Sequence, residues 1–286
     1  MTVRAAVLCL LAPLSASLAA SSAWAQSADP MDQPFARISA SRPAVVEANW
    51  TPMRMPNGER IALAGFSYLM AVDENWGFGP STYGAAQGNF GGLITVGATA
   101  QRRWRLGQNT HLAVSLYAGA GGGLSSEQVR YGGGLMLRPE ISLRTEFDNW
   151  YAGVGVAHVR YPGGTVRDTS LSLVLGRATS FASFSPDDAG RTGRSTTRLG
   201  MGFDEITLYG GYYAPSASTR DRSGQPSRKR LGFAGADLRQ YIAEGSWWGF
   251  EAAGAAQGGA SGYMDMSANA GQDWALWRGA PLRLGA

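Results

Sequence analysis

The stretch LMLRPEISLRTEF, residues 135–147, decides the fold, because its apolar and polar residues alternate almost without interruption. One set of alternate positions carries Leu135, Leu137, Pro139, Ile141, Leu143 and Phe147. The other set carries Met136, Arg138, Glu140, Ser142, Arg144 and Glu146. Side chains that alternate with period two point to opposite faces of a β-strand. The segment therefore predicts a long strand with an apolar medium on one face and a polar medium on the other.

The same alternation recurs along the chain and is interrupted at short intervals by turn-forming residues. It predicts twelve strands, at residues 43–53, 61–71, 76–87, 93–105, 111–121, 133–147, 150–161, 169–181, 198–213, 231–242, 247–257 and 262–274. No helix is predicted outside the first 25 residues. The fold class is therefore all-β.

The predicted connections form two alternating series. Short turns lie near residues 72–75, 106–110, 148–149 and 243–246. They alternate with connections that are longer on the whole, at 54–60, 88–92, 122–132, 162–168, 214–230 and 258–261. The connection near 182–197 is long although it falls in the short series. Short turns at one end and longer loops at the other are typical of an up-and-down barrel in an outer membrane.

A pentapeptide recurs at an offset of 170 residues, since GAAQG occupies positions 84–88 and again positions 254–258. In the same register Gly92, Ala98, Ala100, Trp104 and Leu106 match Gly262, Ala268, Ala270, Trp274 and Leu276. On the predicted strand list this offset spans eight strands, and an even number preserves strand direction. We interpret the match as a duplication within the chain, although drift within a glycine- and alanine-rich composition is the alternative.

The first 25 residues have the pattern of a secretory signal peptide. Arg4 is followed by an apolar run, and Ala23-Trp24-Ala25 forms a cleavage motif. Cys9, the only cysteine, lies inside this segment, so an exported chain is predicted to carry no thiol and no disulfide. Residues 26–42 are interpreted as a periplasmic lead-in.

Composition and charge exclude several classes of protein. Hydrophobic residues make up 44% and aromatic residues 10% of the chain, which argues against disorder. After residue 25 no apolar run is long enough for a transmembrane helix. The net charge of +4 is modest and dispersed, so nucleic acid is not expected as a partner. The two histidines and the single cysteine offer no metal-ligand spacing, and no metal or cofactor is expected.

An exported chain of two-faced strands without disulfides can form two kinds of stable fold. One is a soluble sandwich with its apolar faces inward, and the other is a closed barrel with its apolar faces toward lipid. Strand length, the charged polar face and aromatic residues near strand ends favour the barrel. The aromatic residues are Trp76, Phe78, Trp104, Phe147, Trp150, Tyr151, Tyr161, Phe181, Tyr212, Tyr213, Tyr241, Trp247, Trp248 and Trp274.

Over residues 43–274 the sequence resembles bacterial outer-membrane β-barrel proteins as a class. The resemblance implies an antiparallel transmembrane barrel, here of about twelve strands, in the cell outer membrane. It implies outer-membrane lipid, lipopolysaccharide and the barrel-assembly machinery as partners. Residues 275–286 are then a periplasmic tail or the start of a further strand of a larger barrel.

Candidate site residues lie on the polar faces of two neighbouring strands. If Tyr151 and Tyr161 face lipid, then His158 and Arg160 face the lumen, where Arg138 and Glu140 also point. Such a cluster is either catalytic or, more commonly, a packed ionic network. The stretch 134–176 faintly resembles the lipid A 3-O-deacylase family, in which a histidine precedes a serine nucleophile by two positions.

Only His158 matches that deacylase pattern, because Arg160 and Tyr161 occupy the serine and asparagine positions. A hydrolase would then need Ser170 or Ser172 on the next strand as its nucleophile. The loop 214–230 supplies a second candidate group, a basic cluster suited to lipopolysaccharide phosphates or simply to solvent: Arg220, Arg222, Arg228, Lys229 and Arg230.

The sequence thus favours a non-enzymatic outer-membrane barrel, as an envelope structure, a porin-like passive channel or an anchor for a partner. The alternatives are a lipid A-modifying acyl hydrolase on a barrel and a soluble periplasmic β-sandwich binding module.

Overall fold

A computed structural model describes residues 40–88, 92–123, 125–183, 202–216, 218–220, 224–225, 230–242, 246–258, 262–275 and 283–285. Within these ranges the protein is all-β, every paired strand is antiparallel, and no helix has the length and apolar character needed to cross a bilayer. The predicted signal peptide and nearly all of the predicted lead-in, residues 1–39, lie outside the described residues.

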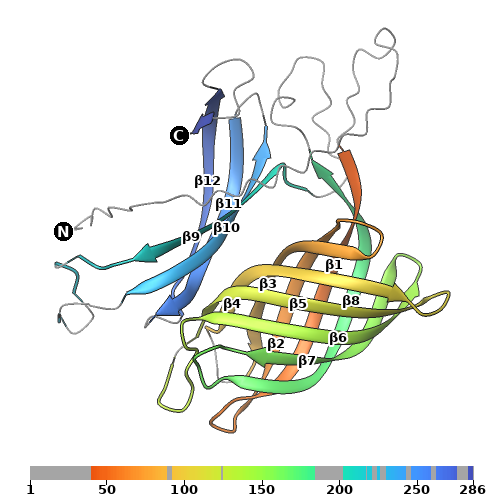
Figure 1. Ribbon diagram of the computed structural model, residues 1–286, viewed down its shortest axis with the longest axis horizontal. Helices are drawn as coiled ribbons and strands as arrows, with labels where there is room; N and C mark the ends of the chain where they lie inside the picture. Colours follow the sequence, from red (N-terminus) through yellow and green to blue (C-terminus); the bar gives the residue numbers. More distant parts are fainter. Residues whose placement is uncertain are drawn as a thin grey trace.

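Eight consecutive strands form a closed up-and-down barrel (Figure 1). They are β1 (Ala40–Arg54), β2 (Arg60–Ala71), β3 (Trp76–Gln87), β4 (Ile94–Arg105), β5 (Thr110–Gly122), β6 (Leu135–Phe147), β7 (Trp150–Arg160) and β8 (Arg167–Ser183). Closure is made by β1 and β8, which pair from Ala40 with Ser183 to Trp50 with Leu173. Because the barrel is closed, none of its strands presents a free edge.

The remaining strands form a separate open sheet in the order β13-β12-β11-β10-β9. They are β9 (Glu205–Tyr213), β10 (Leu231–Tyr241), β11 (Ser246–Gly258), β12 (Met264–Ala275) and β13 (Arg283–Gly285). The prediction of one barrel of about twelve strands is therefore wrong in its closure, although the twelve predicted strands are present in outline. Sequence periodicity identifies strands but carries no information on which two strands meet to close a barrel.

The polarity of the barrel is inverted relative to a soluble protein. Large apolar side chains are exposed on its outer wall, with Ile141 50% and Leu171 73% exposed, while Arg138 and Arg144 are 1% and 2% exposed inside it. This arrangement explains the alternation of apolar and polar residues at 135–147. One face of β6 (Leu135–Phe147) forms the outer wall, and the other face fills the lumen.

The internal repeat is also a repeat of structure. β2, β3 and β4, moved by 170 positions, coincide with β10, β11 and β12 to within one residue at each end. The pairing register is the same, since Ala64 pairs with Gly84 and Ala234 with Gly254. Both sheets carry a register shift at the equivalent place, between Ala62 and Leu63 in the barrel and between Gly232 and Phe233 in the open sheet.

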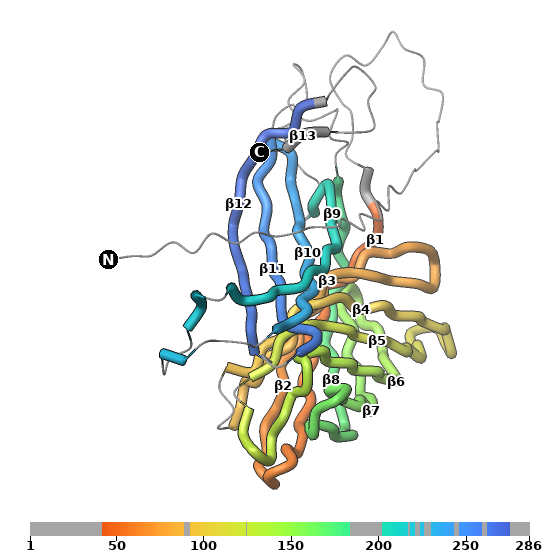
Figure 2. The backbone as a smooth tube through the Cα atoms, turned by 60° about the vertical axis from the view of Figure 1, so that its left-hand side comes forward, coloured from red at the N-terminus to blue at the C-terminus, as the bar shows by residue number. Residues whose placement is uncertain are grey.

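The open sheet stands beside the barrel, and β11 contacts the wall at β5 (Figure 2). The contact is backbone against backbone near the hairpin that joins β5 and β6. A Cβ atom at Gly134 would lie 2.2 Å from the carbonyl oxygen of Ala255, and one at Gly254 would lie 2.5 Å from that of Ala120. Only glycine therefore permits this approach.

Candidate functional site

The lumen of the barrel holds a buried network of charged and polar side chains. Its centre is the ion pair between Arg144 Nη1 and Glu47 Oε2 at 2.7 Å. The Tyr151 hydroxyl donates to the same carboxylate oxygen at 2.7 Å, and Gln101 Nε2 donates to it at 3.2 Å. Asn49 donates to the other oxygen, Oε1, at 3.1 Å. The carboxylate of Glu47 is thus surrounded by donors from four different strands.

A second ion pair lies next to the first. Arg138 Nη2 contacts Glu140 Oε2 at 2.5 Å and donates to Thr51 Oγ1 at 2.8 Å. Ser172 donates to the same Glu140 oxygen at 2.6 Å, and Glu140 Oε1 lies 3.7 Å from Arg144. The two pairs are therefore one network with two arginines and two glutamates, whose charges balance.

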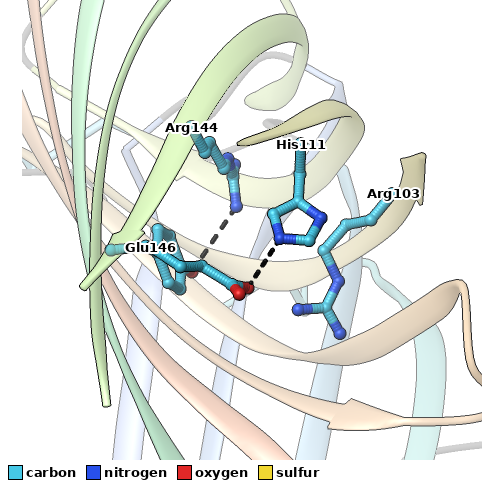
Figure 3. A pocket seen from close by; sticks show the side chains of 5 residues that line it. Arg103, His111, Arg144 and Glu146 are labelled. Carbon is cyan, nitrogen blue, oxygen red and sulfur yellow. Dashed lines mark hydrogen bonds and ion pairs between the residues drawn. The ribbon is translucent and has the colours of Figure 1, made fainter. Parts of the chain in front are cut away.

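A small pocket lies where the lumen opens toward the hairpins β2–β3, β4–β5 and β6–β7, here named the turn end (Figure 3). It is lined by Arg103, His111, Arg144, Glu146 and Tyr151 and has a volume of about 10 Å³. His111 Nε2 lies 3.0 Å from Glu146 Oε1. Such a volume accommodates about one water molecule and is too small for an organic substrate.

The opposite end, formed by the hairpins β1–β2, β3–β4, β5–β6 and β7–β8 and here named the loop end, is closed by apolar side chains. Val129 and Tyr131, from the connection between β5 and β6, are fully buried. Tyr131 packs edge-on against Tyr161, with the ring centroids 4.9 Å apart. Burial raises the pKa of Tyr131 to about 12, so its phenol stays neutral to a higher pH than that of an exposed tyrosine. This cluster caps the lumen with non-polar groups.

The outer wall carries a broad apolar surface with an aromatic border. The middle of the wall is lined by exposed aliphatic side chains: Val114, Leu116, Ile141, Leu143, Val154, Val156, Leu171, Leu173 and Leu175. The turn end is bordered by exposed rings: Trp76, Trp104, Phe147 and Trp150. Arg102 stacks on two of these rings, 5.5 Å from Trp76 and 4.9 Å from Trp104.

Four exposed arginines lie on the wall at the loop end, one on each of the adjacent strands β2, β1, β8 and β7: Arg60, Arg54, Arg167 and Arg160. We name them the loop-end arginine row. Arg54 pairs in register with Arg60, and Arg160 pairs with Arg167, so the side chains of each pair are neighbours on one face. The row concentrates positive charge at one level of the wall.

The structure brings together only part of the cluster expected from the sequence. Arg138 and Glu140 point into the lumen, whereas His158 and Arg160 lie on the outer wall, where His158 Nδ1 is 2.7 Å from Thr169 Oγ1. The difference arises at Tyr151, whose hydroxyl bonds Glu47 in the lumen rather than facing outward. With Tyr151 inside, the alternation of β7 places His158 outside.

The histidine and the serines considered for acyl hydrolysis lie on opposite faces of the wall. Ser170 donates to Asp168 at 2.7 Å and Ser172 donates to Glu140, both from the inner face of β8. His158 lies on the outer face, so no hydrogen bond joins it to either serine, and the geometry for activating a nucleophile is missing from this pair.

The basic loop 214–230 is described only in part. Arg220 and Arg230 are described, while Arg222, Arg228 and Lys229 lie outside the described residues. Among the described residues, no group of three or more histidine, cysteine, aspartate or glutamate side chains could hold a metal ion.

Sequence reasoning missed Glu47, Gln101 and Tyr151 as members of the lumenal network. Glu47 and Gln101 each occupy a polar position in an alternating strand, so the two-residue period predicts the face of the strand on which each side chain lies. It does not give the strand across the lumen that each would meet.

No model of a known protein family matches the chain, and a search of curated proteins also gives no match.

Proposed function

We propose that this protein is an integral β-barrel of a bacterial outer membrane whose role is structural. One observation carries the proposal, namely the inverted polarity of a closed barrel. Rows of leucine and valine are exposed on the outside of the barrel, and arginine–glutamate pairs are buried inside it. This arrangement suits a hydrocarbon solvent, whereas exposure of the apolar rows to water is costly. The aromatic border with stacked arginines at the turn end suits a membrane–water interface.

The filled lumen favours a scaffold or anchor over a passive channel. Eight strands leave a lumen that side chains can fill, unlike the twelve expected from the sequence. Here that space is occupied by the ionic network and, at the loop end, by the apolar cap. The separation of His158 from both serines gives no support to hydrolysis.

The loop-end arginine row supports an orientation in which the loop end faces the cell exterior. Guanidinium groups bind phosphate through paired hydrogen bonds, and lipopolysaccharide presents phosphates at the outer-leaflet surface. The predicted signal peptide supports export, and the barrel-assembly machinery would then be the partner that inserts the chain.

Membrane residence is tested by fractionation and gel mobility. The full chain should float with outer-membrane vesicles, resist extraction at high pH, and migrate faster on gels before boiling than after. Recovery of folded protein from the periplasm without detergent would contradict the proposal.

The orientation is tested with the four loop-end arginines changed together to serine. Lipopolysaccharide co-purifying with the barrel should fall several-fold, because the phosphate contacts are lost. The control changes two exposed arginines at the turn end, Arg102, which stacks on Trp76, and Arg177, which stacks on Trp150. Arg102→Ser with Arg177→Ser should leave lipopolysaccharide unchanged. Equal losses in both variants would contradict the orientation.

A further inference from the structure

The internal repeat gives the barrel and the open sheet a set of equivalent positions on their polar faces. In the barrel three of these positions hold hydroxyl side chains, Ser67, Ser81 and Thr99, which are buried beside Gly79. Ser81 pairs in register with Ser67 and donates to Thr99 Oγ1 at 2.7 Å. The barrel therefore fills this part of its lumen with neutral groups.

In the open sheet the same three positions hold Asp237, Glu251 and Asn269, beside Gly249. They lie on the neighbouring strands β10, β11 and β12 (Figure 2). Asp237 pairs in register with Glu251, and Gly249 pairs with Asn269, as their equivalents do in the barrel. Two carboxylates directly opposite each other on a sheet repel. The change from hydroxyl groups to these residues therefore calls for a compensating positive charge.

Several oxygen atoms of this group have partners within the protein. Arg239 Nε donates to Asp237 Oδ2 at 2.5 Å. The Tyr209 hydroxyl donates to Glu251 Oε1, and Asn269 Nδ2 donates to Glu251 Oε2 at 3.4 Å. Among the described residues, Asp237 Oδ1 and Asn269 Oδ1 are buried without a hydrogen-bond partner, and Asp237 is only 5% exposed. Buried oxygen atoms without a donor are costly, and a cation would satisfy both.

The two oxygen atoms point at one place above β11. A Cβ atom at Gly249 would lie 3.0 Å from Asn269 Oδ1 and 3.2 Å from Asp237 Oδ1. The nearest atom to that place is also an oxygen, the backbone carbonyl of Leu238 at 2.8 Å. At the equivalent glycine of the barrel, Gly79, only one of the three nearest atoms is an oxygen. Glycine within a strand permits close approach of a ligand, and here oxygen atoms from both neighbouring strands line that approach.

The local charge also favours a cation. Arg283 pairs with Ala275, six residues along β12 from Asn269, and so lies about 20 Å from the group. Around the group itself two carboxylates meet one guanidinium, that of Arg239. Among the described residues, the polar face of the open sheet carries these charged residues: Glu205, Asp237, Glu251, Asp265, Asp273, Arg239 and Arg283.

We propose that Asp237, Asn269 and Glu251 form a binding site for a hard divalent cation such as Ca²⁺. Asp237 Oδ1 and Asn269 Oδ1 are its direct ligands. Glu251 supplies a second negative charge and, through Asn269 Nδ2, turns the amide oxygen toward the ion. Ca²⁺ accepts carboxylate and amide oxygens in an adaptable geometry and completes its shell with water. The bound ion connects β10 to β12 across β11.

Tb³⁺ luminescence tests the site, because Tb³⁺ replaces Ca²⁺ at oxygen ligands and is excited through nearby tryptophan. Trp247 lies two residues from Gly249 on the same strand and the same face. The full chain is refolded from urea into detergent free of lipid, so that no lipopolysaccharide carries the ion into the sample. We expect one Tb³⁺ to bind per chain and Ca²⁺ to displace it.

The test variant gives the open sheet the residues of the barrel, as Asp237→Ser, Glu251→Ser and Asn269→Thr. Since the barrel already accommodates these residues at equivalent positions, the sheet should form, and the affinity for Tb³⁺ should fall at least tenfold. The matched control, Glu205→Gln with Asp273→Asn, also removes two negative charges from the same face. It should change the affinity by less than threefold.

Asn269→Thr alone removes one ligand and leaves every charge in place, so it tests the site even if the triple variant does not fold. Its affinity should fall at least fivefold. Equal losses in the triple variant and the control would show diffuse attraction to an acidic surface and overturn the proposal. An unchanged affinity in Asn269→Thr, or no binding to the parent chain, would also overturn it. Heat-modifiable mobility in the same samples reports separately on the function proposed above.

Discussion

Arg144 is the residue on which the lumenal network depends, because it contacts Glu47, Gln101 and Tyr151 and lies 3.7 Å from Glu140. Arg144→Met would leave Glu47 buried without its counter-charge. We expect the free energy of unfolding to fall by about 3–5 kcal/mol. Urea unfolding of the barrel in lipid vesicles, followed by tryptophan fluorescence, measures the change.

Two further variants separate lost charge from lost packing. Adding Glu47→Gln to Arg144→Met should restore part of the stability, because no unpaired charge then remains at that position. Arg105→Met, at an exposed position of the turn end, should change it by less than about 0.5 kcal/mol. A double variant no more stable than Arg144→Met would count against a charge-based network.

Tyr131 makes the loop end sensitive to alkaline pH. Its pKa is about 12 when folded and about 10 when the residue is exposed, so the unfolded chain loses this proton first. Stability from this residue is complete below pH 10 and is lost as pH rises from 10 to 12. Among the described residues its hydroxyl has no hydrogen-bond partner.

Tyr131→Phe should therefore be as stable as the parent protein at pH 8 and more stable at pH 11. Urea unfolding at both pH values compares the two proteins directly. An equal loss of stability with pH in both would show that other groups control the alkaline transition.

At the scale of the element, β6 tests which solvent the outer wall meets. Ile141 lies at the middle of the strand and is half exposed on the outer face. Ile141→Arg should destabilise the barrel in vesicles by about 2–4 kcal/mol, since a guanidinium at mid-bilayer is costly. On the same face near the turn end, Thr145→Arg should cost at most about 1 kcal/mol. Equal small effects in the two variants would point to a wall that faces water.

The individual strands follow from the sequence much more fully than their assembly does. The sequence predicts a strand at residues 133–147, and the structure places β6 at Leu135–Phe147. β9 begins at Glu205, whereas the sequence predicts a strand from 198; residues 198–201 lie outside the described residues, and 202–204 precede the strand. The face of β7 was assigned from Tyr151 as a lipid-facing aromatic. A tyrosine suits either an interface or a buried hydrogen bond, and period alone cannot distinguish the two.

At the scale of the whole molecule, the filled lumen predicts an electrically silent barrel. Planar bilayers containing the purified full chain should show no ion conductance above background, because the ionic network and the loop-end cap occupy the interior. Resolved single-channel steps that disappear when the protein is omitted would contradict this.

The offset of the internal repeat corresponds to the number of strands in the barrel. The sequence alone does not show this correspondence, because it does not show which strands close the barrel. The offset spans eight strands, and eight is the number that closes. The lumenal network depends on contacts between strands far apart in the chain, such as Arg144 with Glu47, and a pattern within one strand carries no such information. Arg138 and Glu140 were predicted as neighbours because they share one strand and one face.

The matching registers of β1–β4 and β9–β12 create a competition during biogenesis. While the chain is folding, β5 can meet β4 or the equivalent edge of β12, and backbone hydrogen bonding does not distinguish them. The tight turn Leu106–Asn109 joins β4 to β5 within four residues, so that hairpin forms long before a distant strand arrives. Lengthening this turn would remove the kinetic advantage and yield mispaired, protease-sensitive chains.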